Sequence, residues 1–585
     1  MLAKIKRYFN YFNLFLMHKN KKTFLNIFLS ELKGINTSEA HIEKNNINSQ
    51  FYFNKLVILT TKHCYFVAHS IKNTLADEFD SIEILQEKPM QGYEDCLHFV
   101  ICPNFFQELP KRYIAYQMEQ SVSNRWFNEK YFNTLNNALS ICDYSNYNIQ
   151  FLRHNGIPFS SLNYLPIGYF RNYKQYLCVE NVVADYDVVF YGDINCQRRR
   201  AFLEQISKRF KTLIIYNLFG IDLVKQLLRA KIVINIHYYD YALLETPRIF
   251  ESLSLDKIVI SEESSDMREH ENLKDIVDFV KEMDISGMIE KISYWLNNAT
   301  EMNKKISRNR FMLNGDKFSN KFYLHRFLLS LDLIKYHTFY QKNNSYINIK
   351  KINGNGAMVC LSTKESIERR KSFTNDTKEK NIAIFDGLRH KKAWVGCGLS
   401  YKAIINKAKD LKLDYVIILE DDVDFTSDFW FRLDVILSYL KINTDWDIFC
   451  GLLTDTHDDL KISNIASYKN ELFLHVNKFC GMVCNIYSKR SFDKILEWDN
   501  LNTNLENNAI DRFLEHANLK IITTLPFLAG HKEELNSTLW NGSNINYRQL
   551  IASSINKLNN KQLDWTFCKA IETNQESVLK SLEYN

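Results

Sequence analysis

The chain has 585 residues, of which 46% are hydrophobic and 24% are charged, and its formal net charge is +6. This is the composition of an ordinary globular protein, and the chain is too long for one hydrophobic core, so we expect two or three domains. The mildly basic balance is too weak and too dispersed to favour nucleic acid as a partner.

The N-terminal segment, residues 1–50, is basic and aromatic. Within it, residues 4–34 mix aromatic residues, leucines and lysines. Such a segment can lie flat on an anionic membrane or pack as helices against the first domain. The chain has no run of about 18 apolar residues, so we expect no membrane-spanning helix. It shows no signal peptide and 12 scattered cysteines, which predicts a cytoplasmic protein, with peripheral contact to the inner face of the membrane as an alternative.

Residues 51–180 alternate between strand-like and helical runs. The strand-like runs are apolar and rich in Ile, Val, Leu and Tyr, which is typical of buried strands. They fall at 55–61, 81–87, 98–104, 113–119 and 138–145, and a helical run falls at 66–79. Strands that alternate with helices predict a parallel sheet.

A second round of the same alternation occupies residues 181–335. Its strand-like runs are 186–193, 212–220 and 227–237, with an arginine-rich helix at 198–210 and a helix leading into a strand at 245–263. We therefore predict two successive doubly wound, Rossmann-like halves. The polar and basic stretch 336–356 ends in NGNG and is predicted to be a linker.

Residues 357–545 are predicted to form a third α/β domain, and residues 546–585 a helical tail. Strands are expected at 357–363, 382–387, 446–453 and 481–488, and a glycine-broken turn, GCGLS, is expected before a helix at 401–411. The predicted fold class is thus α/β, with two Rossmann-like halves followed by a further α/β domain.

One strand of this third domain stops at three adjacent acids, Glu420, Asp421 and Asp422, within the stretch VIILEDDVDF. Neighbouring carboxylates repel one another, so a cation would stabilise the end of this strand. Magnesium or manganese is typically held by one or two carboxylates, with phosphate oxygens and water completing the shell. A nucleotide diphosphate with a divalent cation therefore fits this position, and a solvated acidic turn is the alternative.

Several ordered pieces of the third domain resemble glycosyltransferase family 25, which includes lipooligosaccharide glycosyltransferases and collagen galactosyltransferases. The pieces are CLSTKESIERRKSF, FDGL, GCGLSYKAIINKAKDLKLDYVIILEDDVDF, KFCGMVCNIYSKRSFDKIL, NAIDRFLEH and PFLAGHKEELNST. The resemblance implies a GT-A-like fold. It also implies transfer of a sugar, often galactose, from a nucleotide diphosphate sugar such as a UDP-sugar, with Mn²⁺ or Mg²⁺ as cofactor.

The resemblance also implies roles for the acids of this domain. Asp422 becomes the first choice as metal ligand and a catalytic residue, with Glu420 and His531 as further metal ligands. Asp421 would reach the ribose of the donor or the metal. Asp511 would lie on the acceptor side as a catalytic base or sugar-binding carboxylate, and the alternative for it is a simple acid at a helix N-terminus.

The resemblance also suggests roles for two arginines, and two residues of this chain differ from the family pattern. Arg369 and Arg370 would contact the nucleotide of the donor, or else form an exposed basic face. Tyr401 stands where the family often shows histidine, and His531 stands where the family usually shows glutamine. Donor or acceptor binding would differ from the family at these two positions.

A second set of candidate donor-binding residues lies in residues 186–265. Gly192 ends a strand, where a residue without a side chain lets a ligand approach the backbone. Glu245, Arg248 and Glu251 gather near a predicted helix start, whose partial positive charge favours phosphates. Arg248 can bind a diphosphate in bidentate fashion, and Glu251 can accept hydrogen bonds from ribose hydroxyls. The alternative is a surface ion pair of Arg248 with one of the glutamates.

This stretch resembles the C-terminal, nucleotide-sugar-binding half of GT-B glycosyltransferases of the family 1/4-like group, in which R-x-F-E-x-L precedes a strand such as KIVISE. The two-glutamate spacing common in that group is not reproduced, because Glu245 and Glu251 lie too close together.

The sequence thus predicts a bifunctional glycosyltransferase that adds sugars from nucleotide diphosphate sugars to a growing surface glycan, a lipooligosaccharide or polysaccharide. Its partners would be the donor and a glycan acceptor, and not nucleic acid. Three alternatives stay open. One active domain can be joined to a glycan-binding scaffold, the acids can serve a metal-dependent hydrolase or nucleotidyltransferase, or the acceptor can be protein hydroxylysine.

Overall fold

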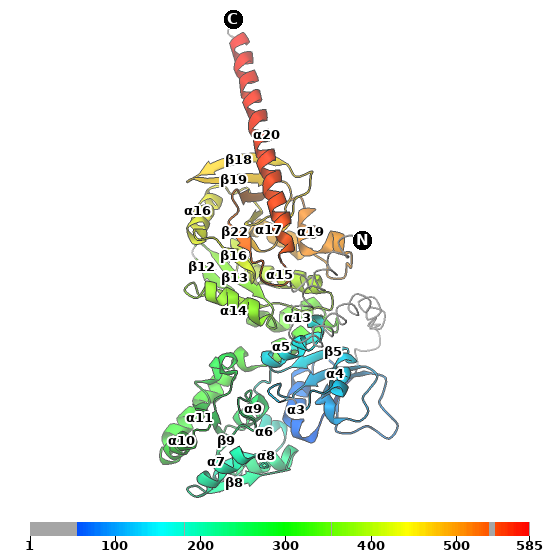
Figure 1. Cartoon of the computed structure of the whole chain (residues 1–585), viewed down its shortest axis with the longest axis vertical. Coiled ribbons are helices and arrows are strands. Elements are labelled where there is room, and N and C mark those ends of the chain that lie inside the picture. The colour runs from blue at the N-terminus through cyan, green and yellow to red at the C-terminus, as the bar shows by residue number, and fades with distance from the viewer. Residues whose placement is uncertain (1–54, 124, 181, 353, 538–543, 584–585) are drawn as a thin grey trace, which may run out of the picture. The chain divides into compact units, whose positions relative to one another are not determined.

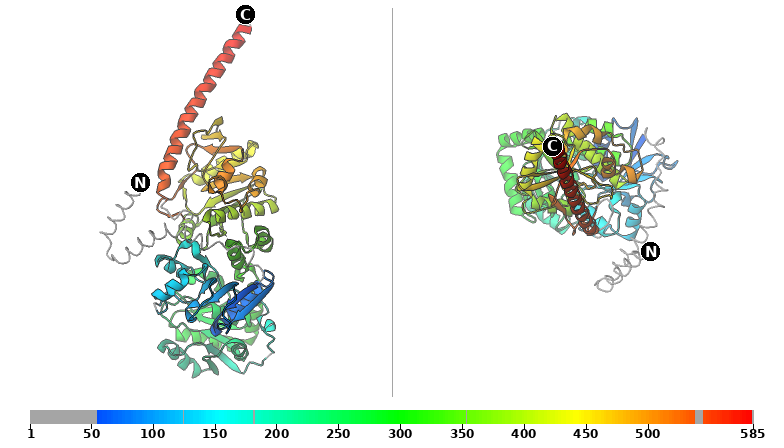
Figure 2. Two further views of the ribbon diagram at one scale, coloured as in Figure 1. Left: turned by 90° about the vertical axis from the view of Figure 1, so that its right-hand side faces the viewer. Right: turned by 90° about the horizontal axis from the view of Figure 1, so that it is seen from above.

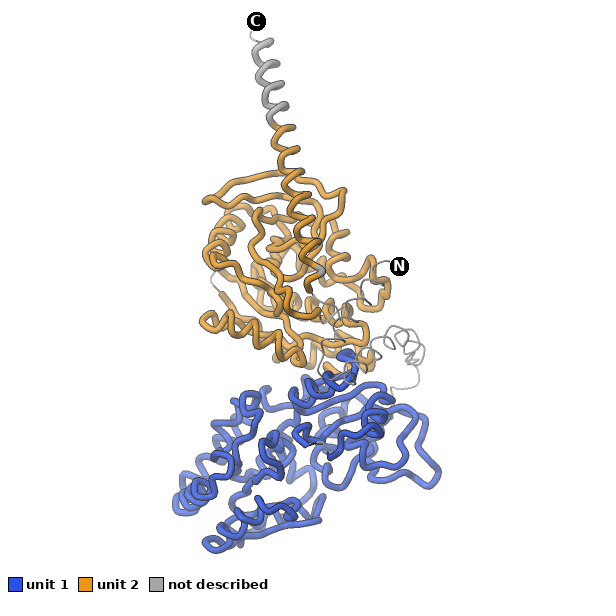
Figure 3. Tube along the Cα trace, viewed as in Figure 1, with its two compact units in different colours: residues 1–324 blue, residues 325–585 orange. Residues whose placement is uncertain are grey.

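The computed structural model describes residues 55–123, 125–180, 182–352, 354–537 and 544–583. The chain divides into two compact units, Met1–Leu324 and His325–Asn585 (Figure 3). The basic and aromatic segment 4–34 lies outside the described residues. Within the described part, no helix is both long and apolar enough to cross a membrane.

Unit 1 begins with a six-stranded parallel sheet in the order β2-β1-β3-β4-β5-β6. Strands β3, β4 and β5 are buried along their whole length, as expected for a parallel sheet that is covered on both faces. The elements are β1 Lys55–Leu59, η2 Lys62–Cys64, α3 Tyr65–Thr74, β2 Ser81–Leu85, β3 Leu97–Ile101, η3 Pro103–Phe105, β4 Tyr113–Gln117, α4 Glu129–Asn136, β5 Ser140–Asp143, α5 Asn146–His154, η4 Phe159–Ser161, β6 Leu162–Tyr164 and α6 Tyr173–Tyr176.

The second sheet of unit 1 has five parallel strands in the order β11-β10-β9-β7-β8. Its core joins apolar side chains of β7, β9 and β10 to those of α7 and α10. The prediction of two Rossmann-like halves is therefore confirmed. The elements are β7 Tyr186–Tyr191, α7 Gln197–Ser207, β8 Thr212–Ile215, α8 Gly220–Leu228, β9 Ala230–Asn235, α9 Thr246–Ser254, β10 Ile258–Glu262, η5 Met267–Glu269, η6 Glu271–Leu273, β11 Asp278–Val280, α10 Ile285–Asn297, α11 Ala299–Leu313, η7 Asp316–Phe318 and α12 Lys321–Ser330.

The carboxyl ends of these two sheets face each other. Gln120, which follows β4, exchanges hydrogen bonds of 3.0 and 2.9 Å with the backbone of Leu243, which follows β9. Asn146, which follows β5, donates to Glu269, which follows β10, at 3.2 Å. Helices α3 and α9 lie side by side between the two sheets (Figure 1). Open α/β sheets hold their ligands at this edge.

Unit 2 is built on a nine-stranded mixed sheet in the order β12-β13-β15-β20-β17-β21-β19-β18, with β14 also pairing with β13. β13, β14 and β15 are parallel, and β20 runs antiparallel to β15. A separate pair, β16 and β22, places His531 opposite Val423, directly after the three acids. The elements are α13 Tyr336–Asn343, η8 Asn344–Tyr346, β12 Lys350–Ile352, β13 Gly356–Ser362, α14 Ile367–Asp376, β14 Ala383–Asp386, α15 Ala393–Asp410, β15 Tyr415–Glu420, β16 Val423–Phe425, α16 Phe429–Ile442, β17 Ile448–Cys450, β18 Ile462–Tyr468, β19 Glu471–Val476, β20 Cys484–Ser488, α17 Lys489–Leu496, α18 Leu505–Asn508, α19 Ile510–Glu515, β21 Ile521–Thr524, β22 Ala529–His531 and α20 Asn546–Glu583.

The prediction that GCGLS forms a turn is wrong, because α15 runs through it. A Cβ on Gly398 would lie 2.4 Å from the ring of Trp498, and one on Gly396 would lie 2.7 Å from the carbonyl oxygen of Leu388. Both glycines therefore serve close packing against the helix. Glycine has the same appearance in a sequence whether it breaks a helix or lets a neighbour approach.

Residues 336–356 are not an extended linker. They contain α13 and the edge strand β12, which pairs with β13, and the two compact units divide earlier, inside α12. Phe339 is buried in α13, but polar and basic neighbours hide it in the sequence. The residues predicted as a tail form α20, which packs beside β18 and continues past the sheet (Figure 2).

Candidate active sites in the two units

Two guanidinium groups meet beside Gly192, at the end of β7. Gly192 has a φ of +140°, and a Cβ there would lie 3.0 Å from Arg248 Nη2 and 3.3 Å from Arg199 Nη1. Both guanidinium groups also lie over the ring of Phe190, at 5.9 and 5.2 Å from its centre. We expected Gly192 to open the backbone to a ligand. In the structure it makes room for the two arginines, which are themselves suited to hold one.

The positive charges of Arg199 and Arg248 are close enough to repel each other. Burial and then the charge of Arg248 lower the pKa of Arg199 to about 10. Arg199 is fixed by the carbonyl oxygens of Asp193 and Ile236, at 2.8 and 2.9 Å, whereas Arg248 is half-buried. An anion bound to Arg248 would relieve this repulsion, with Arg199 contributing its charge from within the protein.

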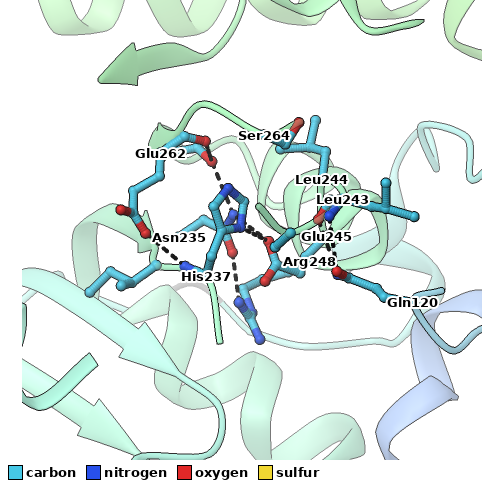
Figure 4. Close-up of polar contacts among 12 residues, drawn as sticks. Gln120, Asn235, His237, Leu243, Leu244, Glu245, Arg248, Glu262 and Ser264 are labelled. Atoms are coloured by element: carbon cyan, nitrogen blue, oxygen red, sulfur yellow. Dashed lines mark hydrogen bonds and ion pairs between the residues drawn. The ribbon is translucent and has the colours of Figure 1, made fainter. Parts of the chain in front are cut away.

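A polar network behind Arg248 sets its position (Figure 4). Arg248 Nη1 donates to Asn235 Oδ1 at 2.6 Å, and Asn235 Nδ2 donates to Glu245 Oε2 at 3.1 Å. The same glutamate oxygen lies 2.6 Å from His237 Nδ1. Burial alone would raise the pKa of Glu245, but His237 and the arginines hold it well below its usual range, while Glu245 raises the pKa of His237 despite burial. Glu245 is therefore an ionised residue that holds Arg248 in place through Asn235.

The alternative for Arg248, a surface ion pair with Glu245 or Glu251, is not formed. Glu245 pairs with His237 and, at 3.8 Å, with Arg199, and within the described part of the chain no carboxylate lies within ion-pair distance of Arg248. Its guanidinium group thus keeps charge available for a ligand.

The first turn of α9 has few free N–H groups. Pro247 has none, Thr246 N donates to Leu244 O at 2.7 Å, and Arg248 N donates to Glu245 O at 3.0 Å. The helix N-terminus contributes its field, but hydrogen bonds to a phosphate have to come from side chains.

Glu251, which we expected to bind ribose, is only 8% exposed and accepts a hydrogen bond of 3.0 Å from the Tyr191 hydroxyl. Burial raises the pKa of Glu251 to about 7. A carboxyl group that stays protonated in the folded chain, but ionises in the unfolded chain, stabilises the fold at low pH, and this contribution is lost as pH rises towards the folded-state pKa.

We therefore expect Glu251→Gln to change stability in a pH-dependent way. Relative to the wild type, the variant should gain about 2–3 kcal/mol of unfolding free energy between pH 5 and pH 8, because glutamine carries no ionisation penalty and keeps an acceptor for Tyr191. Urea unfolding of the full chain at both pH values measures this, with Glu290→Gln, at an exposed position of α10, as control. An equal difference at the two pH values would contradict it.

In unit 2 the acids of β15 surround Arg369. Arg369 Nε donates to Asp421 Oδ1 at 2.6 Å, Nη2 lies 2.8 Å from Asp422 Oδ2, and Nη1 donates to Asn536 O at 3.0 Å. We expected Arg369 to contact the nucleotide, but all three of its nitrogens are bound within the protein. Its positive charge instead balances the negative charges of Asp421 and Asp422. Arg370 forms an ion pair with Asp386 at the end of β14.

Asp422 combines a negative charge with a free oxygen atom. Its Oδ2 accepts from His531 Nε2 at 3.0 Å and from Asn544 Nδ2 at 3.1 Å. Burial alone would raise the pKa of Asp422, but Arg369 and His531 hold it well below its usual range. Asp422 Oδ1 and His531 Nδ1 are buried and have no hydrogen-bond partner among the described residues. A free carboxylate oxygen fits a hard divalent cation such as Mn²⁺ or Mg²⁺.

The pKa of Glu420 is raised, whereas that of Asp422 is lowered. Burial and the charge of Asp422 raise the pKa of Glu420 to about 8, and the Tyr401 hydroxyl donates to it at 3.3 Å. The ligand atoms of Glu420, Asp422 and His531 do not all lie within 4.8 Å of one another, so the structure does not assemble the three metal ligands that we expected.

Asp511 lies in the first turn of α19. Its Oδ1 accepts from Arg512 N at 2.9 Å, and its Oδ2 accepts from Cys480 Sγ at 3.4 Å. Burial, followed by the charges of Glu420, Asp422 and Asp511, raises the pKa of Tyr547 to about 12. Tyr547, at the start of α20, thus lies within the electrostatic influence of all three acids.

The chain matches no protein-family profile and no curated protein sequence. Among solved structures, sucrose-phosphate synthase from Thermosynechococcus elongatus is similar at 10% identity and a TM-score of 0.33, over 50% of this chain and 100% of that one. Anabaena HepE in complex with UDP and glucose is similar at 9% identity and a TM-score of 0.33, over 48% and 100%. TarM is similar at 10% identity and a TM-score of 0.29, over 41% of this chain and 55% of TarM, so this chain spans about half the length of TarM. Because these scores are low, they assign no function, and the evidence for one lies in the sites.

Proposed function

We propose that the chain is a glycosyltransferase with two sites, each of which takes a nucleotide diphosphate sugar as donor and transfers the sugar to a growing glycan. The observation that carries this proposal is the pair of guanidinium groups, Arg199 and Arg248, beside Gly192. They lie at the carboxyl end of β7, the edge that faces the other sheet. Paired guanidinium groups match the oxygens of a diphosphate in charge and in hydrogen-bond geometry.

In unit 1 Arg248 would hold the donor, and the charges of both arginines would neutralise the diphosphate as it leaves. Fixed positive charge at this point favours the transition state, where negative charge develops on the leaving group. Asn235 and Glu245 keep Arg248 in place, so the site is organised before the donor binds. No metal is required for this arrangement.

In unit 2 we propose a second site, of the family 25 type. Asp422 would hold Mn²⁺ or Mg²⁺ together with the phosphate oxygens of the donor, and the cation would neutralise the leaving diphosphate. Arg369 balances Asp421 and keeps the acids together. Asp511 would accept the proton of the acceptor hydroxyl. The family resemblance favours galactose as the transferred sugar, and a surface glycan as the acceptor.

The experiment is a panel of UDP-sugars incubated with the full chain and glycan acceptors, with Mn²⁺ or with EDTA. We expect release of UDP together with transfer of the sugar, in part without metal. Release of UMP would instead indicate a hydrolase or nucleotidyltransferase, because a different bond is then broken. Failure of every nucleotide diphosphate sugar to bind would reject the proposal.

A further inference from the structure

Three soft ligands gather in the first half of unit 1. His63 and Cys64 lie in η2, directly after β1, and Cys102 follows the neighbouring strand, β3. The Cys64 and Cys102 sulfurs are 3.4 Å apart, and Cys102 Sγ lies 3.7 Å from His63 Nε2. Their ligand atoms all lie within 4.8 Å of one another, and no other trio of His, Cys, Asp or Glu in the described ranges does so.

The fold brings these side chains together. β1 and β3 are adjacent and parallel, so the residues that follow them meet at the same edge of the sheet. Cys102 has a φ of +55°, a left-handed conformation that cysteine rarely adopts. Such backbone strain is typical of functional positions, where a side chain has to point in one direction.

The separations match those around a single tetrahedral metal ion. Zinc–sulfur bonds of about 2.3 Å and zinc–nitrogen bonds of about 2.0–2.1 Å place two sulfurs about 3.8 Å apart, and a sulfur and a nitrogen about 3.6 Å apart. The observed values are 3.4 and 3.7 Å, so small movements would complete the geometry.

The chemistry of the trio also suits a soft cation. The described cysteines are free, and the thiolate is the form that binds metals. Sulfur and imidazole ligands select zinc over magnesium or calcium, which prefer oxygen.

We propose that His63, Cys64 and Cys102 bind one Zn²⁺ ion and leave a fourth coordination position open. Three protein ligands with an open position are typical of zinc sites that take water or a substrate atom. The two sulfurs are buried, whereas the His63 side is exposed. Helix α3, which follows η2 directly, packs beside α9, the helix that carries Arg248. The zinc site does not depend on the proposed transferase function.

The test uses the full chain, reduced and freed of metal, then titrated with Zn²⁺ and with Co²⁺. We expect one tightly bound Zn²⁺, and a cobalt–thiolate charge-transfer band in the near ultraviolet. Cys64→Ser and Cys102→Ser should abolish the band. His63→Ala, at an exposed position, should weaken Zn²⁺ binding about 10- to 100-fold without disturbing the buried core.

Cys96→Ser is the matched control, because Cys96 lies 4.0 Å from His98 in the same sheet and forms part of no trio within the described ranges. This variant should keep the band. Divalent cations at the acids of unit 2 do not produce it, because those ligands contain no thiolate. A reduced chain without the band, whose Cys64 and Cys102 form a disulfide on mild oxidation, would overturn the proposal in favour of a redox pair. A band that survives both serine variants would also overturn it.

Discussion

Replacing Arg248 with alanine is expected to weaken UDP binding to unit 1 by about 10- to 150-fold, because a charge-assisted hydrogen bond to an anion contributes about 1.5–3 kcal/mol. The guanidinium group is already held by Asn235 at 2.6 Å, so little conformational entropy is lost when the diphosphate binds. Calorimetry of the full chain in EDTA measures this affinity. EDTA keeps the acids of unit 2 free of metal, so that a second, metal-dependent site does not obscure the result.

Arg200→Ala is the matched control for this prediction. Arg200 lies on α7 next to Arg199 but is exposed, so the variant removes the same charge without touching the pair beside Gly192. It should bind UDP nearly as the wild type does. Arg248→Lys should recover only part of the affinity, since lysine keeps the charge but loses the planar fork. Equal losses in Arg248→Ala and Arg200→Ala would mean that the anion binds elsewhere or responds only to net charge.

The two halves of unit 1 could be predicted from the sequence because buried parallel strands have a simple pattern. Residues 56–59 of β1 and 232–234 of β9 are apolar and buried, and a helix follows each strand. Helix α15 could not be placed in the same way. The effect of Gly398 depends on Trp498, which is 100 residues away in the sequence, and no local pattern contains that contact.

The candidate sites show the same division. Arg248 and Gly192 stand out because they lie at element ends, but their partner Arg199 is one of three consecutive arginines. Successive helix residues point about 100° apart, so only the fold distinguishes them: Arg198 pairs with Glu262, Arg199 reaches Gly192, and Arg200 is exposed.

Other site residues carry no motif at all. Asn235 and His237 depend on where β9 ends, and Asn544 and Tyr547 follow the last recognisable piece of unit 2. All four are identified by their contacts, which join segments far apart in the sequence or at the ends of elements.

Asp422→Asn is expected to reduce metal-dependent sugar transfer by about 100-fold or more. The variant would bind the cation less tightly, and the leaving diphosphate would then lack the positive charge that neutralises it. The variant should still fold. Its side-chain oxygen can accept from His531 and Asn544 as Oδ2 does, and Asp421 still pairs with Arg369. The Mn²⁺ affinity, followed by the electron paramagnetic resonance of free Mn²⁺, should fall together with activity. Asp424→Asn, two residues further on and exposed, is the control and should leave both unchanged.

Combined with Arg248→Ala, this variant separates two enzymes from one enzyme with a scaffold. If both units are active, Asp422→Asn removes only the transfer that needs Mn²⁺, and Arg248→Ala removes only the transfer that persists in EDTA. One variant that removes all transfer, while the other removes none, would leave a single catalytic unit. Mn²⁺ binding that is unchanged in Asp422→Asn would place the cation away from Asp422 Oδ1. The buried charge of Asp422 would then be balanced by Arg369 and His531 alone, as a structural ion network.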